Sequence, residues 1–365
     1  MVNKPLTKNI DMSRSPLDIS AYEKNDGYQS LKTISGGLSP ADVLQIVKDS
    51  GLKGRGGAGF PTGLKWSFVP QSDGSPGQRY FVVNADEMEP GTFKDRLLME
   101  GDPHLLLEGI IIGAYTIQAS IAYIFLRGEY KVSEERLKKA ISEAYERGYL
   151  GKDIQGTGFD LDVIVHTSAG RYICGEETAL LNALEGKRAN PRAKPPFPQV
   201  SGLWGKPTIV NNVETLCNLP GIIAYGVDWY QGLSVGKDHG TKLFGISGKI
   251  KNPGCWELPL GISIRELLEG YGGGMQDGLE LRAFLPGGGS TDFMLPEHLD
   301  VKLDYDEIAK VGSRLATGTM ILLDNKTCPV GMIGNLMKFF AHESCGFCTP
   351  CRDGLPWVDE IFNEF

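Results

Sequence analysis

Apolar positions along the first two thirds of the chain follow two alternating patterns, short continuous runs and longer runs with a helical period. The continuous runs predict buried strands at 80–87, 121–126 and 161–167, because strands covered on both faces lack a polar side. The helical runs predict helices that begin at Ser39, Asp102 and Ser133 and end near Gly51, Gln118 and Gly148. This alternation favours an α/β fold with a mainly parallel sheet.

The pattern changes near residue 240. Segments 241–250 and 255–259 predict a strand pair, and a capping-box sequence at Ser263 opens a short helix. Further strands at 280–285 and 319–323 complete a small α+β module. An apolar helix at 332–341 then leads into a group of cysteines.

These changes divide the chain into four segments. Residues 1–38 are polar and weakly periodic, so we expect an N-terminal extension that runs over the surface. The remaining segments are an α/β domain at 39–240, the α+β module at 241–329, and the start of a helical domain at 330–365.

Composition narrows the class of protein. A chain of 365 residues, 41% hydrophobic and 22% charged, suits two or three globular domains. A net charge of −8 argues against a nucleic-acid surface, which is usually basic. Seven cysteines without a secretory leader indicate a reducing compartment, and we expect a cytoplasmic protein. The apolar run at 105–117 is too short to span a bilayer, so any membrane association would go through partners.

Cys345, Cys348 and Cys351 follow the spacing C-x2-C-x2-C. Three thiolates in one tight run favour a [4Fe–4S] cluster over the two alternatives, a zinc site or a redox sensor. In the bacterial ferredoxin run a fourth cysteine would stand at position 355, where this chain has Leu355. A fourth ligand must therefore come from elsewhere.

The segment Gly54-Arg-Gly-Gly-Ala-Gly59 matches the dinucleotide fingerprint G-x-G-x-x-G. That fingerprint follows a strand and opens a helix, whereas here a helix precedes it and Pro61 follows, so we do not assign the fingerprint's usual role. The loop can still cradle a phosphate or ribose through its amides, and Arg55, Lys65, Phe60 and Phe68 bracket it. The alternative is an ordinary tight loop beside a buried aromatic residue.

Polar residues also follow the first predicted strand. Asn84, Asp86, Glu87 and Glu89 stand where open α/β sheets collect ligands. Carboxylates there suit hydroxyl and ring N–H donors better than phosphates. A structural turn with a salt bridge to Arg96 is the alternative.

Two further polar turns open helices. In the first, Gly175, Glu176 and Glu177 can bind a ligand or simply cap the helix. In the second, Asn211, Asn212 and Thr215 can hold a phosphate. Neither H-E-x-x-H nor G-x-S-x-G occurs, so the sequence gives no sign of a hydrolase.

Five motifs stand in order along the chain: Gly54-Arg-Gly-Gly-Ala-Gly-Phe-Pro-Thr-Gly-Leu-Lys-Trp, Asn84-Ala-Asp-Glu-Met-Glu-Pro-Gly-Thr, Cys174-Gly-Glu-Glu-Thr-Ala-Leu, Val210-Asn-Asn-Val-Glu-Thr-Leu and Glu343-Ser-Cys-Gly-Phe-Cys-Thr-Pro-Cys. Taken together, they closely resemble one family, the NADH-binding flavoprotein subunits of respiratory NADH:quinone oxidoreductase (complex I). The resemblance covers the chain from about residue 40 to its end. Five ordered motifs are far more specific than any one alone.

The resemblance implies an NADH dehydrogenase that passes hydride from NADH to FMN and then single electrons to one [4Fe–4S] cluster. It implies a Rossmann-like domain for FMN and NAD(H), a small ubiquitin-like (β-grasp) domain and a C-terminal helical iron–sulfur domain. The expected FMN residues are Gly54, Arg55, Gly56, Gly57, Lys65, Asn84, Asp86, Glu87, Gly175, Glu176, Asn211, Asn212 and Thr215. The expected NADH residues are Gly59, Phe60, Phe68, Glu89, Glu177, Lys194 and Phe197, with Glu89 positioning NADH and no side-chain acid or base required.

The resemblance also implies partners. These are other subunits of the peripheral arm, especially a thioredoxin-like [2Fe–2S] subunit and a multi-cluster subunit, on the cytoplasmic face of the inner membrane, with electrons passing on to quinone. In this family the fourth cluster cysteine follows the third at a distance that lies beyond residue 365. We therefore expect a C-terminally incomplete sequence, with cluster binding weakened or lost.

Two other functions stay open. The first is the diaphorase subunit of a soluble NAD-linked hydrogenase or formate dehydrogenase, which shares the motifs. The second is a non-catalytic electron-transfer or assembly module, which would lack flavin.

Overall fold

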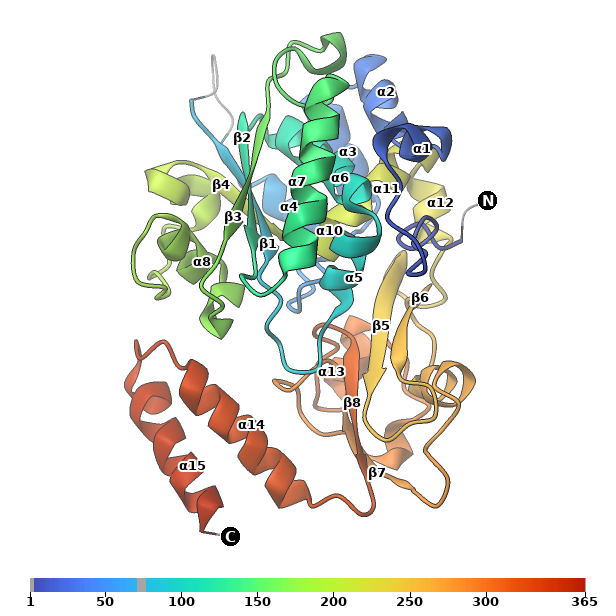
Figure 1. Cartoon of the computed structure of the whole chain (residues 1–365), viewed down its shortest axis with the longest axis vertical. Coiled ribbons are helices and arrows are strands. Elements are labelled where there is room, and N and C mark those ends of the chain that lie inside the picture. Colours follow the sequence, from blue (N-terminus) through green and yellow to red (C-terminus); the bar gives the residue numbers. More distant parts are fainter. Residues whose placement is uncertain (1–2, 71–76, 365) are drawn as a thin grey trace.

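The computed structural model describes residues 3–70 and 77–364 and contains two four-stranded sheets followed by a helical hairpin (Figure 1). The first sheet has the order β3-β2-β1-β4, and each neighbouring pair is parallel. Its strands are β1 (Tyr80–Ala85), β2 (Ile121–Leu126), β3 (Asp162–Thr167) and β4 (Thr208–Asn212). Three of the four confirm the pattern of continuous apolar runs, and β4 was not predicted.

Helices cover both faces of this sheet (Figure 1). Phe81, Val83 and Ala85 of β1 point into the larger core, which they share with α3 (Pro40–Asp49), α6 (Pro103–Ile117) and α7 (Lys131–Glu146). Val82 points the other way and packs with Leu180 of α8 (Glu177–Leu184). Burial on both faces explains why β1 and β2 read as continuous apolar runs, whereas β3, at the edge of the sheet, is partly exposed.

The predicted helix starts are confirmed at Ser39 and Asp102 but not at Ser133. The Ser39 and Asp102 side chains accept hydrogen bonds from the backbone N–H groups of Asp42 and Leu105. Helix α7 instead begins at Lys131, so Ser133 lies inside its first turn, fully buried. Its hydroxyl donates to the carboxylate of Glu100 at 3.2 Å, which makes Ser133 a packing residue rather than a cap.

The expectation of a surface-running N-terminal extension is wrong. This segment forms α1 (Ile19–Lys24) and α2 (Gln29–Ser35), and it contributes Leu6, Tyr22 and Tyr28 to the main core. The Glu108 carboxylate of α6 anchors it, because it accepts from the Tyr22 hydroxyl at 2.6 Å and from the Tyr28 N–H at 2.9 Å. The segment is polar overall, so the few residues that anchor it produce no recognisable hydrophobic pattern in the sequence.

The second sheet has the order β6-β5-β8-β7. Strands β5 (Thr241–Ser247) and β6 (Gly254–Pro259) are antiparallel, β5 and β8 (Thr319–Asp324) are parallel, and β7 (Leu281–Leu285) runs antiparallel to β8. Phe244, Ile246 and Met320 lie in its own hydrophobic core. A mixed four-stranded sheet with the first and last strands at its centre confirms the predicted α+β module.

The chain ends in a hairpin of α14 (Pro329–Glu343) and α15 (Leu355–Asn363) (Figure 1). The first of these helices was predicted and the second was not. No helix within residues 3–70 and 77–364 has the length and apolar character needed to cross a membrane.

The remaining elements are short helical segments that lie between the strands and helices already described. They are α4 (Thr62–Trp66), α5 (Lys94–Gly101), α9 (Pro198–Ser201), α10 (Val213–Cys217), α11 (Leu219–Tyr225), α12 (Val227–Gln231), α13 (Tyr305–Lys310) and the turns Ile154–Gly156, Tyr172–Gly175, Leu203–Gly205, Glu266–Tyr271, Pro296–His298 and Pro350–Gly354.

Candidate functional site

The carboxyl ends of β1 and β4 bring two of the predicted polar segments together. Asn84 and Asn212 are direct neighbours in this parallel pair. The Asn84 Nδ2 donates to the Gly175 carbonyl at 3.2 Å, which brings the turn before α8 to the same edge. The sheet edge therefore collects three of the segments that the sequence singled out.

The glycine loop lies against this edge. The Arg55 N–H donates to Thr215 Oγ1 at 2.8 Å, and a Cβ at Gly56 would lie 3.1 Å from the Cβ of Asn212. Gly57 has φ +143 and open space within 4 Å of a built Cβ, so its bare backbone faces a free volume. A glycine-lined edge of this kind lets a flat ligand approach the backbone closely.

Contrary to the expectation for an FMN residue, the Arg55 side chain does not face the glycine-lined edge. It is fully buried, and its Nη2 donates to the Tyr230 hydroxyl at 3.0 Å and to the carbonyls of His239 and Thr241 at 2.9 and 3.2 Å. The guanidinium thus holds the underside of the loop against the start of the second sheet. Only the backbone of Arg55 remains available to a ligand at the loop.

Tyr305 of the second sheet's module supports the loop from the other side. Its hydroxyl donates to the Gly54 carbonyl at 2.8 Å. Gly59 has φ +64, and a Cβ there would lie 2.6 Å from the Tyr305 ring. Glycine is therefore required at position 59 by both its backbone conformation and the neighbouring ring.

Asp86 is a buried carboxyl group, and only one of its two oxygens accepts a hydrogen bond from the described residues. Its Oδ1 accepts from Ser168 Oγ at 3.2 Å, whereas its Oδ2 is buried without a hydrogen-bond partner among the described residues. Burial raises the pKa of Asp86 to about 7. A buried acceptor that lacks a donor is what a ligand hydroxyl or ring N–H would satisfy.

Glu87 is held in a buried turn, but not by the salt bridge to Arg96 that was weighed as the alternative. Its carboxylate accepts from the N–H groups of Asp95 and Arg96 at 2.9 and 3.1 Å and from the Tyr130 hydroxyl at 3.1 Å. Burial, followed by repulsion from Asp95, raises the pKa of Glu87 to about 7. The Arg96 guanidinium pairs with Glu100 instead, so the turn uses the Arg96 backbone rather than its charge.

Glu89 links the sheet edge to the second sheet. Its Oε2 accepts from the Tyr172 hydroxyl at 2.7 Å, and its Oε1 accepts from the Ser290 N–H at 2.6 Å. Neither Tyr172 nor Ser290 was singled out from the sequence, because no motif marks a residue that acts by holding another one.

The acidic turn before α8 is paired with lysines. Glu176 caps α8 by accepting from the N–H groups of Thr178 and Ala179, and its other oxygen accepts from Lys194 Nζ at 3.0 Å. Lys65 Nζ donates to Glu177 at 2.8 Å and to the Val210 carbonyl at 2.8 Å. Gly175 next to this turn has open space around a built Cβ, as Gly57 does.

The polar start of α10 is likewise held in place. Asn211 Oδ1 accepts from Trp66 Nε1 at 2.8 Å, and Asn212 Nδ2 donates to Asp95 Oδ2 at 2.6 Å. The backbone atoms of this turn therefore have fixed positions beside the glycine loop.

Three exposed phenylalanines flank the site in sequence. Phe60, Phe68 and Phe197 are 46%, 51% and 53% exposed. The ring centroids of Phe60 and Phe68 are 6.4 Å apart. Exposed paired rings are typical of a surface on which a flat ligand stacks.

Cys345, Cys348 and Cys351 lie between α14 and α15, on the partly exposed turn of the hairpin. All three are free thiols, and Cys351 Sγ is 3.1 Å from Ser344 Oγ. Within the part of the chain that is described, no three His, Cys, Asp or Glu side chains are gathered as a metal site. The thiols are available, but they are not arranged around a common centre.

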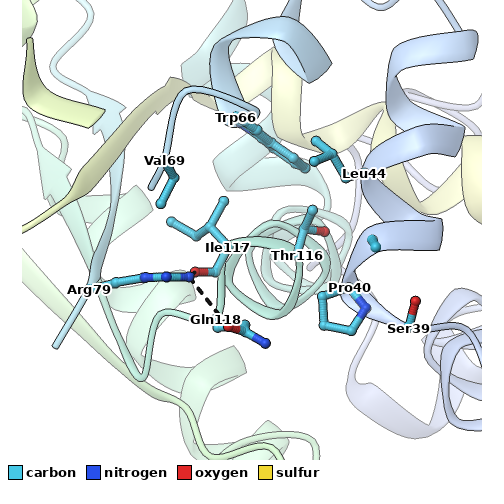
Figure 2. A pocket seen from close by; sticks show the side chains of 10 residues that line it. Ser39, Pro40, Leu44, Trp66, Val69, Arg79, Thr116, Ile117 and Gln118 are labelled. Carbon is cyan, nitrogen blue, oxygen red and sulfur yellow. Dashed lines mark hydrogen bonds between the residues drawn. The ribbon is translucent and has the colours of Figure 1, made fainter. Parts of the chain in front are cut away.

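A separate cavity of about 260 Å³ lies at the other end of β1 (Figure 2). Leu44, Trp66, Arg79 and Ile117 are among its lining residues. Arg79 already donates to the carbonyls of Ile117 and Pro70 at 2.9 and 2.8 Å. None of the candidate site residues lines this cavity, so it is treated as separate from the candidate site.

Comparison with known families gives three matches along the chain. Residues 47–221 match the Nuo51 FMN-binding domain, residues 243–292 match the SLBB domain, and residues 331–365 match the NADH-ubiquinone oxidoreductase-F iron-sulfur binding region.

Individual proteins show the same similarity. The chain is 58% identical over 359 residues to the F subunit of NADH-quinone oxidoreductase in both Salmonella typhimurium and Escherichia coli, covering 98% of this chain and 80% of each relative. Among solved structures, an NAD+-reducing [NiFe]-hydrogenase in the H2-reduced state matches with a TM-score of 0.81 and 34% identity, over 97% of this chain. The chain spans 57% of that hydrogenase chain, a little over half of its length.

Proposed function

This chain belongs to the family of NADH-quinone oxidoreductase F subunits, and from that premise we propose which of its residues carry the family's chemistry. It is an oxidoreductase component of complex I, with FMN, NADH and one [4Fe–4S] cluster as its cofactors. Identity of 58% to complex I subunits, against 34% to the hydrogenase, favours complex I over a hydrogenase diaphorase.

The glycine-lined sheet edge is the observation that carries the proposal for FMN. Gly57 and Gly175 leave room for a flat ring system, and the unpartnered Asp86 oxygen offers it an acceptor. The residues proposed to hold FMN are Gly54, Gly56, Gly57, Lys65, Asn84, Asp86, Gly175, Glu176, Asn211, Asn212 and Thr215. Arg55 and Glu87 support these residues from behind.

Bound FMN would supply the hydride acceptor and the source of single electrons, so the protein's own part is binding and alignment. Phe60, Phe68 and Phe197 would stack on the adenine of NADH and exclude water from it. Lys194, Glu177 and the backbone of Gly59 would fix the remainder of the dinucleotide. Glu89 would fix the position of the nicotinamide end of NADH, because two hydrogen bonds already orient its carboxylate.

We further propose that Cys345, Cys348 and Cys351 supply three ligands of the [4Fe–4S] cluster. The spacing of these free thiols on the hairpin turn supports this assignment. The thioredoxin-like [2Fe–2S] subunit, a multi-cluster subunit and the cytoplasmic face of the inner membrane remain our proposed partners and location. The domain limits 39–240, 241–329 and 330–365 are proposals of the same kind.

The role of Glu89 can be tested by the variant Glu89→Gln. We expect NADH-dependent ferricyanide reduction to fall while FMN stays bound, because the FMN residues are untouched. The exposed Glu135→Gln serves as a matched control. Unchanged kinetics with intact flavin absorbance would remove Glu89 from the NADH site, and a chain without flavin would favour the non-catalytic alternative.

A further inference from the structure

A loop of the second sheet's module presses directly against the carboxylate that we place in the NADH site. The loop, Gly287 to Ser290, follows β7, and its Ser290 N–H donates to Glu89 Oε1 at 2.6 Å. Gly288 has φ +109, and a Cβ built there would lie 2.6 Å from Glu89 Cγ and 2.9 Å from Oε1. Carbon atoms in van der Waals contact stand about 3.5–4.0 Å apart, so no larger residue fits at position 288 without moving Glu89.

The loop is itself fixed to its surroundings at several points. The Gly289 N–H donates to the Pro90 carbonyl at 3.0 Å, and the Thr317 N–H and hydroxyl both donate to the Gly287 carbonyl, at 3.2 and 2.7 Å. Thr92 and Thr317 share a hydrogen bond of 2.8 Å. The segment from Glu89 to Thr92 is therefore docked on the second sheet's module at both of its ends and at Pro90.

The geometry points to Gly288 and Ser290 as positioning residues for NADH, acting through Glu89. This inference rests on the proposed role of Glu89. The module of the second sheet contributes no predicted NADH residue. It helps to set the position of the Glu89 carboxylate through one oxygen, while the Tyr172 hydroxyl holds the other. Gly288 leaves the space that Glu89 occupies, and the Ser290 amide orients its Oε1.

The test compares two glycine-to-alanine variants of the full chain loaded with FMN. Gly288→Ala places a methyl group against Glu89. Gly312→Ala also forces alanine to a positive φ, +84, but into open space. Both changes carry backbone strain, so the control separates strain from displacement of Glu89. For Gly288→Ala we expect the KM for NADH to rise by about fivefold or more, with the FMN Kd unchanged and no rise in KM for Gly312→Ala.

A double-mutant cycle with Glu89→Ala supplies a readout that general loosening of the loop would not give. Once the Glu89 side chain is removed, Gly288→Ala has nothing to displace, so the double variant should have the KM of Glu89→Ala alone. Additive effects, or equal effects of Gly288→Ala and Gly312→Ala, would overturn the inference. A wild-type KM in Glu89→Ala would instead overturn the proposed role of Glu89 and the inference with it.

If Gly288→Ala fails to fold, Arg314→Leu tests the same loop from the surface. The Arg314 guanidinium donates to the Ser290 carbonyl, and Arg314 is exposed, so its loss should leave the core intact. We expect a smaller rise in KM for NADH with unchanged FMN affinity, and a wild-type KM would count against the loop's role.

Discussion

Replacing Asp86 with asparagine should stabilise the flavin-free protein, and should do so more strongly at pH 8 than at pH 5. Asp86 is only 5% exposed, and one of its oxygens has no hydrogen-bond partner among the described residues. Burial raises its pKa from 3.8 to about 7. The folded protein therefore holds an uncompensated charge whenever Asp86 is ionised.

The sign and size follow from the two pKa values. A carboxyl whose pKa is raised by folding contributes its full stability below pH 3.8 and loses it as the pH rises through about 7. The accumulated cost relative to the protonated state is about 1.7 kcal/mol at pH 5 and about 4 kcal/mol at pH 8. Asparagine carries no charge at either pH, so its advantage over aspartate should grow by about 2.5 kcal/mol between the two.

Urea unfolding followed by circular dichroism at both pH values measures this difference directly. Asp277→Asn is the matched control, since the Asp277 side chain is 94% exposed and should show no such pH dependence. Comparing variant and wild type at each pH removes the contribution of other titrating groups. An advantage of Asp86→Asn that is the same at pH 5 and pH 8 would refute the reasoning that burial raises this pKa.

Three further outcomes are expected. Tyr22→Phe should lower the free energy of unfolding by about 1–2 kcal/mol, because the buried Glu108 loses a donor at 2.6 Å; urea unfolding checks this, with the exposed Tyr145→Phe as control. Phe60→Ala should raise the KM for NADH while FMN affinity stays unchanged. Steady-state kinetics measure the KM and flavin fluorescence measures bound FMN; loss of FMN from the variant would contradict the assignment of Phe60 to NADH. Cys348→Ser should reduce iron bound per chain, whereas Cys328→Ser, also an exposed free thiol, should not; equal iron in both variants would contradict the cluster assignment.

Local patterns predicted much of the fold because the physics that forms those elements is local. Strands β1 and β2 are buried on both faces and so carry their signal in consecutive apolar residues. Ser39 marks the start of α3 because its side chain caps that helix with a residue three positions away. In each case the residues that define the element are the ones that stabilise it.

The missed elements depend on distant partners. Strand β4 is only five residues long and ends in two asparagines, so its strand character comes from pairing with β1. The N-terminal helices are short, and their anchor is Glu108, 86 residues along the chain from Tyr22 and 80 from Tyr28. Periodicity within a short window contains no information about either partner.

The candidate site was likewise predicted only in part. Motifs located the glycine loop, the sheet edge and the turn before α8, and the structure brings these segments together. Motifs did not reveal which side chains face outward. Arg55 and Glu87 belong to these segments, but each side chain turns inward and bonds to buried protein partners.

The second sheet supports the site at two separate places, which argues against treating it as an appended module. Below the glycine loop, Lys242 of β5 lies fully buried, 3.2 Å from Glu214 and 3.5 Å from the Arg55 carbonyl, and Glu214 is also paired with Lys94 at 2.7 Å. Breaking such a buried network by removing one partner leaves an uncompensated charge, so these residues fix how the two sheets meet. At the other side of the site, Ser290 orients Glu89. The proposed FMN edge and the proposed NADH carboxylate therefore both contact the module of the second sheet, and a shift of that module would change both together.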